Sequence, residues 1–248
     1  MANPTRSAPA STSWADGDGA AAAVAAVAAV GRTALVAGAS GLVGRAILQG
    51  LLADKTVTAV HTLGRRLLPL PDPKLTQHVV DFAALPALPA VDEVYLALGT
   101  TIKVAGSQDA FREVDYDANL AVARAMRAQG ASRLGLVSAM GADPQSRIFY
   151  NRVKGELEQA LAQLRYPTLV VARPSFLVGD RGALGQPSRG GETLALVLSR
   201  ALAWLIPDNY QAIEAGQVAR ALLQAVPHTQ GQRILPSSEL RLAPGPGA

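Results

Sequence analysis

The sequence predicts an α/β fold with a doubly wound, mostly parallel sheet, and three observations lead to this fold class. Short apolar runs alternate with segments of helical periodicity over most of the chain. Apolar residues make up 49% of the 248 residues and charged residues 17%, which suits strands that are buried on both faces. The first apolar run also leads through a glycine-rich turn directly into a helical pattern. A chain of this length holds one domain of this class and is too short for two.

Residues 1–31 differ in composition from the rest and are predicted to form a flexible tail rich in Ala and Ser. The run of alanine and valine from Ala20 to Val30 is too short to span a bilayer, which needs about 20 apolar residues. A secretory signal places positive charge before its apolar core, whereas Asp16 and Asp18 stand before this run. We therefore expect a cytoplasmic protein, with an unusual signal peptide as the alternative.

The predicted domain extends over residues 32–242 and is built on six strands. They are Thr33–Ala37, Val57–Leu63, Gln77–Val80, Glu93–Leu98, Leu134–Ser138 and Thr168–Ala172. Between the fourth and fifth strands, apolar residues recur at helical spacing, which predicts one long helix over Ser107–Gln129 that ends at Gly130.

The alternation of strands and helices breaks after Pro174. Residues 179–191 are glycine-rich and polar, Glu192–Ile206 is predicted as an apolar helix, Gln211–Glu214 as a short strand and Gly216–Val226 as a helix. Ligands of open α/β sheets bind at the carboxyl ends of the strands, so we expect residues 179–215 to form a small C-terminal part that covers the substrate. Residues 243–248, rich in Pro and Gly, are expected to be frayed.

The glycine turn at residues 38–44 predicts a site for a dinucleotide, as in the Rossmann fold. The start of the following helix leaves backbone N–H groups unpaired and carries about half a positive charge from the helix dipole, which suits a pyrophosphate. Gly38 allows backbone angles that a side chain forbids, Gly41 allows close approach of the phosphates, and Gly44 allows the helix to pack against its strand. The predicted contacts are Gly38, Ser40, Gly41, Leu42, Val43 and Gly44. An ordinary tight turn is the alternative.

Tyr150 and Lys154 stand four residues apart at the start of a predicted helix, so their side chains lie on one face. A nearby cation lowers the pKa of a phenol from about 10, which would let Tyr150 act as an acid toward a carbonyl while Lys154 also binds a ribose. Ser138 ends the fifth strand, where its hydroxyl could orient the same carbonyl. The alternatives are an exposed Tyr–Lys pair and a serine that caps a loop.

Composition argues against other kinds of site. The chain has no cysteine, so disulfides and thiolate chemistry are excluded. His61, His78 and His228 lack the spacing of metal ligands, so no metal is expected. The formal charge is +4, from 23 Lys and Arg against 19 Asp and Glu, with no basic block that would indicate nucleic-acid binding.

The glycine turn, Ser138 and the Tyr150-x-x-x-Lys154 pair resemble the short-chain dehydrogenase/reductase superfamily. Further segments narrow the resemblance to its atypical branch, which includes the Tat-interacting-protein-like NAD(P)H-binding oxidoreductases. These segments are Leu63–Arg66, Leu96–Thr101, Val114–Asp117, Val137–Ala142 and Ala172–Arg181. The similarity runs from about residue 32 to about residue 227.

The resemblance implies NADP(H) as the cofactor, with NAD(H) less favoured, and the residues after the second strand agree. An acidic side chain there would bind the adenosine 2′-hydroxyl, whereas Arg65 and Arg66 suit a 2′-phosphate. Two surface arginines that close the strand are the alternative. The resemblance places further contacts after three other strands. They are Asp81 and Phe82 at the adenine, Leu98, Gly99, Thr100 and Thr101 at the ribose, and Pro174, Phe176 and Leu177 at the nicotinamide.

These observations predict an NADP(H)-dependent oxidoreductase that reduces the carbonyl of a small, modestly hydrophobic molecule, with Ser138, Tyr150 and Lys154 as catalytic residues. A non-catalytic NADPH sensor that regulates a partner protein is the alternative, and an isomerase or epimerase that retains its cofactor is a third. We expect a monomer or homodimer that binds neither nucleic acid nor membrane.

Overall fold

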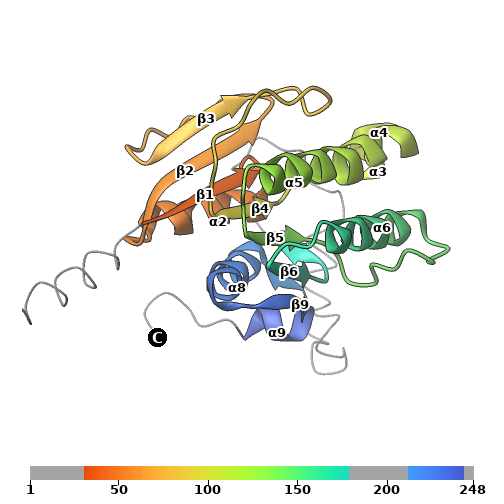
Figure 1. Cartoon of the computed structure of the whole chain (residues 1–248). Coiled ribbons are helices and arrows are strands. Elements are labelled where there is room, and N and C mark those ends of the chain that lie inside the picture. Colours follow the sequence, from red (N-terminus) through yellow and green to blue (C-terminus); the bar gives the residue numbers. More distant parts are fainter. Residues whose placement is uncertain (1–30, 179–211, 243–248) are drawn as a thin grey trace, which may run out of the picture. The chain divides into compact units, whose positions relative to one another are not determined.

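The computed structural model describes residues 31–178 and 212–242, which contain a seven-stranded parallel sheet (Figure 1). The strands are β1 (Arg32–Ala37), β2 (Val57–Gly64), β3 (Leu75–Val79), β4 (Glu93–Leu96), β5 (Arg133–Val137), β6 (Thr168–Arg173) and β9 (Gly231–Pro236). Their order is β3-β2-β1-β4-β5-β6-β9, and every neighbouring pair is parallel. The chain reverses its direction of travel between β1 and β4, which is where doubly wound sheets bind ligands. The predicted fold class is confirmed.

Helices cover both faces of the sheet (Figure 1). One face packs against α2 (Leu42–Ala53) and α8 (Ala215–His228), and the other against α5 (Asn119–Ala128) and α6 (Phe149–Gln163). The central strands contribute to both cores, because successive side chains of a strand point to opposite faces. Each fully buried aliphatic side chain in these cores contributes about 1.5–3 kcal/mol.

The long helix predicted over Ser107–Gln129 is present, with Ser107 as its N-cap and Gln129 as its C-cap, but it contains a π-helical turn that was not predicted. The segment forms α4 (Gln108–Arg112), a π-helical turn η2 (Glu113–Ala118) and then α5. The side-chain amide of Asn119 donates to the carbonyl of residue 114 at 3.2 Å and to that of residue 115 at 3.1 Å, inside the widened turn. Apolar spacing does not distinguish a π turn from an α-helical one, because the buried stripe continues through both.

The sequence also leaves out several short elements. Strand β9 was not predicted because its side chains are mostly exposed and half of them are not apolar. The short helices α3 (Ile102–Ala105) and α9 (Ser237–Arg241) were missed as well. A separate parallel pair joins β7 (Leu177–Val178) to β8 (Ile213–Glu214), and β8 lies within the predicted strand at 211–214.

Some expectations lie outside the described residues. They are the tail at 1–30, the helix at 192–206, most of the region expected to cover the substrate, and the end at 243–248. Within the described ranges, no helix combines the length and the apolar character needed to cross a membrane.

Candidate functional site

The glycine turn between β1 and α2 is shaped by close backbone packing. Gly38 has φ of +91°, and a Cβ on it would lie 2.5 Å from the carbonyl carbon of Ala97. A Cβ on Gly44 would lie 2.1 Å from the carbonyl oxygen of Gly38. A Cβ on Gly41 would meet only that same oxygen, at 3.4 Å. The protein's own packing therefore requires glycine at 38 and 44, whereas the surface over Gly41 is open to a close ligand.

The first turn of α2 presents backbone donors at this surface. The N–H of Arg45 donates to the carbonyl of Gly41 at 2.9 Å and is the first such bond of the helix, so the N–H groups of the three preceding residues have no partner within the helix. Gly41 is the N-cap and offers no side chain, and the first turn holds no acidic residue. The predicted contacts Leu42 and Val43 lie in this turn. Such a helix start can bind an anion.

Lys154 is buried and forms an ion pair with Asp115 of the π turn. Its Nζ lies 2.7 Å from Asp115 Oδ1, and the two side chains are 5% and 1% exposed. The backbone N–H of Thr100 donates to Asp115 Oδ2 at 2.8 Å. Burial lowers the pKa of Lys154, but Asp115 and then Tyr150 raise it, and the net pKa lies above its usual 10.5. The ammonium is therefore held in its charged form.

Tyr150 lies at the start of α6, one turn before Lys154. It is half-buried, and its ring centroid lies 5.6 Å from that of Phe111 in α4. Tyr150 and Lys154 stand four residues apart in α6, so their side chains lie on one face of the helix. The predicted Tyr–Lys pair on one helix face is therefore present, and Lys154 is a buried residue of the domain interior.

Ser138 directly follows β5 and is buried, and its hydroxyl donates a short hydrogen bond to Glu158 of α6. Arg173, the last residue of β6, forms an ion pair with the same carboxylate through its Nη2 at 2.6 Å. Sequence analysis missed Glu158, although it follows Tyr150 and Lys154 at the same spacing of four on one helix face. It also missed Asp115, whose inward position depends on the unpredicted π turn.

A small pocket opens at the carboxyl ends of β2 and β3. Ser40 of the glycine turn and Arg66 both line it, whereas Arg65 does not. Gln77 of β3 holds the loop around it by accepting from the N–H of Leu68 at 2.7 Å and donating to its carbonyl at 3.0 Å. Arg66 therefore lies beside the glycine turn, whereas Arg65 lies outside the pocket, and both residues are exposed.

Two of the residues predicted as cofactor contacts after β4, Gly99 and Thr100, lie next to the buried Lys154–Asp115 ion pair. A Cβ on Gly99 would lie 3.4 Å from Asp115 Oδ1 and 3.9 Å from Lys154 Nζ. The carbonyl of Leu98 accepts from the side chain of Asn119 at 3.2 Å. Thr101 instead caps α3, accepting from the N–H of residue 104 at 3.2 Å.

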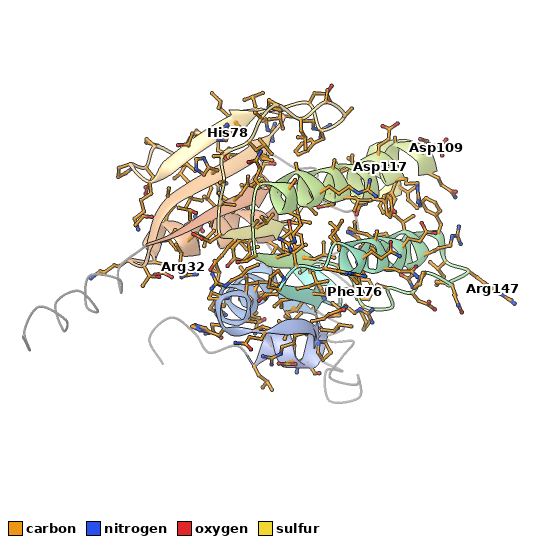
Figure 2. All side chains as sticks on the ribbon, viewed as in Figure 1. Arg32, His78, Asp109, Asp117, Arg147 and Phe176 are labelled. Carbon is orange, nitrogen blue, oxygen red and sulfur yellow. The ribbon has the colours of Figure 1, made fainter. Side chains whose placement is uncertain are left out.

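Other predicted contacts have local partners. Asp81 accepts from the N–H of residue 83 at 2.9 Å, and Phe82 packs against the core that contains α5 and α6. The carbonyl of Pro174 accepts from the N–H of residue 140 at 2.9 Å. Phe176 is 72% exposed (Figure 2), and Leu177 lies in β7.

Three comparisons place the chain among known proteins. A family model described as NAD(P)H-binding matches residues 38–172. The chain is 35% identical over 202 residues to "Protein HTATIP2" of Rattus norvegicus, which covers 77% of this chain and 80% of that protein. It is 32% identical over 220 residues to "Protein FMP52, mitochondrial" of Eremothecium gossypii, covering 84% and 95%.

Among solved structures, "MoeE5 in complex with UDP-glucose and NAD" has a TM-score of 0.62 and 18% identity, and it covers 82% of this chain and 75% of that chain. This likeness supports the fold. The relatives from several fungi are named mitochondrial, which contradicts the expectation of a cytoplasmic location.

Proposed function

This chain belongs to the NAD(P)H-binding family whose model matches residues 38–172, and from this premise we propose that it is an NADP(H)-dependent oxidoreductase. Its proposed reaction is the reduction of the carbonyl of a small, modestly hydrophobic molecule. The observation that carries the proposal is the buried Lys154–Asp115 pair, one helical turn from Tyr150 and in contact range of Gly99. Burying an ammonium costs free energy even when the charge is paired, and ionisable groups in such environments cluster at functional sites.

The residues of the glycine turn fit the pyrophosphate of a dinucleotide. The free N–H groups at the start of α2 point to an anion, and the surface over Gly41 accepts its close approach. Ser40 and Arg66 at the neighbouring pocket suit the extra phosphate of NADP(H) and support it over NAD(H). When bound, the nicotinamide supplies a hydride to the substrate carbon.

The side chains supply the proton. Tyr150 donates its hydroxyl proton to the carbonyl oxygen, and the Lys154 ammonium stabilises the negative charge that then develops on the phenol oxygen. Asp115 holds Lys154 in place and in its charged form. The same ammonium can donate to a ribose hydroxyl on the side of Gly99.

The proposal is tested by titrating the protein with NADPH and NADH by fluorescence, and then screening aldehydes, ketones and quinones for NADPH oxidation. We expect tighter binding of NADPH and turnover of at least one carbonyl compound. Binding without any turnover, together with biological activity that survives Tyr150→Phe, would instead identify a sensor. Cofactor that remains bound through purification, with no net oxidation, would indicate an isomerase.

A further inference from the structure

Glu158 is a buried carboxylate that the proposed reaction does not use. It lies on α6 one turn after Lys154, and only 6% of the residue is exposed. Its two oxygens receive Nε of Arg173 at 3.1 and 3.2 Å and Nη2 of Arg173 at 2.6 Å. Its remaining partner is the hydroxyl of Ser138, the residue expected to orient the substrate.

The donors around Glu158 fix the direction of the Ser138 hydrogen bond. Arg173 carries only donors and binds through two nitrogens, which is the arrangement that an ionised carboxylate accepts. An ionised carboxylate has no proton to give, so the proton between Ser138 and Glu158 comes from the serine. A hydroxyl has one proton and two lone pairs, so the proton of Ser138 is engaged by Glu158 and is not free for another acceptor.

We propose that Glu158 is a positioning residue that holds the hydroxyl proton of Ser138, so that Ser138 presents only hydrogen-bond acceptors to the active site. Under this proposal Ser138 does not polarise the carbonyl, which differs from the expectation drawn from sequence. Of Tyr150 and Ser138, only Tyr150 then donates to the carbonyl oxygen. Ser138 accepts from the Tyr150 hydroxyl or from the hydroxyl of the alcohol product. The consequence for turnover rests on the proposed function, but the hydrogen bond itself does not.

The hydrogen bond can be tested without turnover, because the chain contains no cysteine and Ser138→Cys introduces a single thiol. The thiol is titrated by ultraviolet absorbance, after subtraction of the wild-type curve. A carboxylate that accepts the thiol proton disfavours the thiolate, so we expect a pKa above the usual value of about 8.5. Adding Glu158→Gln to Ser138→Cys should lower this pKa by about one unit or more.

Glu156→Gln is the matched control in the same background. Glu156 lies on the same helix and also pairs with an arginine, Arg112, at 2.5 Å, whereas the hydroxyl of Ser138 is bonded to Glu158. It should leave the thiol pKa unchanged within about 0.3 units. A thiol pKa at or below about 8.5 in Ser138→Cys alone, or a Glu158→Gln effect no larger than that of the control, overturns the proposal.

The effect on turnover is measured by combining Glu158→Gln with Ser138→Ala. In Glu158→Gln the amide oxygen faces the donors of Arg173, so the amide NH2 faces Ser138. The NH2 group cannot accept the hydroxyl proton of Ser138, which is then free to point toward the site. We expect kcat to fall about tenfold with a KM change below about threefold, and no further fall when Ser138 is already alanine. Independent, multiplying effects would show that Glu158 acts only on the fold.

Two safeguards keep the outcomes separate. If Glu158→Gln does not fold, Glu158→Met with Arg173→Met removes both charges together and takes its place in the kinetic comparison. If the wild type binds NADPH but reduces no carbonyl compound, the proposed function fails, and the thiol titration still decides the role of Glu158.

Discussion

At the scale of single residues, the site depends on two ion pairs, in one of which both partners are buried and in the other only the carboxylate. One pair, Lys154 with Asp115, joins helix α6 to the π turn. The other, Glu158 with Arg173, joins α6 to the end of β6. Removing one partner of such a pair leaves a buried charge without compensation and is strongly destabilising. These contacts were not predictable from sequence, because each joins residues that are far apart in the chain.

Asp115→Asn is expected to lower the free energy of unfolding by about 3 kcal/mol, because the buried Lys154 ammonium loses its counter-ion. Urea unfolding at neutral pH measures the change. Asp117→Asn is the control, since Asp117 is exposed on the same turn (Figure 2). Adding Lys154→Met to Asp115→Asn should restore part of the lost stability, and a failure to do so would argue against the ion pair as the cause.

Arg66→Ser is expected to weaken NADPH binding about tenfold while changing NADH binding less than about twofold, because only NADPH carries the 2′-phosphate. Fluorescence titration with both nucleotides measures the two affinities. Arg124→Ser, on the exposed face of α5, serves as the control and should change neither. An equal loss for both nucleotides would remove Arg66 from the choice between them.

At the scale of elements, the spacing of apolar residues predicted the helices that carry the site, but it did not predict the π turn within one of them. The spacing of Tyr150 and Lys154 indicated one face of one helix, and α6 has that face. The π turn before α5 was hidden in a continuous apolar pattern, and with it the inward position of Asp115. Two contacts between neighbouring elements lead to predictions.

The junction of α2 with the glycine turn leaves no room for a side chain at residue 44. Gly44→Ala is expected to destabilise the domain by about 1–3 kcal/mol and to weaken NADPH binding at least about tenfold, because its Cβ would overlap the Gly38 carbonyl oxygen at 2.1 Å. Gly216→Ala is the control, since the nearest atom to its Cβ is the end of Arg220 at 3.4 Å. Thermal unfolding and calorimetric titration measure the two effects, and tight NADPH binding by Gly44→Ala would contradict the assignment of the turn.

The neighbouring strands β2 and β3 carry a histidine pair, in which Nδ1 of His61 lies 3.1 Å from Nε2 of His78. Burial, and then His78, lowers the pKa of His61 below its usual 6.5. The neutral ring therefore adds stability that is present above pH 6.5 and is lost as the pH falls through the folded-state value.

Wild type should therefore lose about 0.5 kcal/mol more stability between pH 7.5 and 5.5 than His61→Gln, a small effect because the ring is partly exposed. Urea unfolding at both pH values measures it. His228→Gln leaves the pair intact and should keep the wild-type loss. An equal loss in His61→Gln and wild type would show that the pair does not contribute.

At the scale of the whole molecule, the alternation of apolar runs and helical patterns was sufficient to predict a parallel, doubly wound sheet. Six of its strands were predicted close to their observed bounds, and all of these except the edge strand β3 contain buried apolar residues. Strand β9 was missed because its side chains are mostly exposed and half of them are not apolar. The position of Ser138 at the end of β5 was also predicted, but its partner Glu158 was not, because sequence gives the place of a side chain and tertiary packing selects its contacts.

The sheet order brings the glycine turn after β1 and the loop after β4 to one edge of the sheet. Lys154 of α6 lies at the loop after β4, because it pairs with Asp115 and lies close to Gly99.

The central claim is that Tyr150 gives its proton to a carbonyl beside a bound nicotinamide. The most direct measurement is the rate of NADPH oxidation by wild type and Tyr150→Phe in the presence of a reducible carbonyl, with NADPH affinity measured on the same samples. We expect Tyr150→Phe to react at least about a hundredfold more slowly with its NADPH affinity within about threefold of wild type, while Tyr116→Phe reacts like wild type. An equal rate in Tyr150→Phe and wild type would contradict the account.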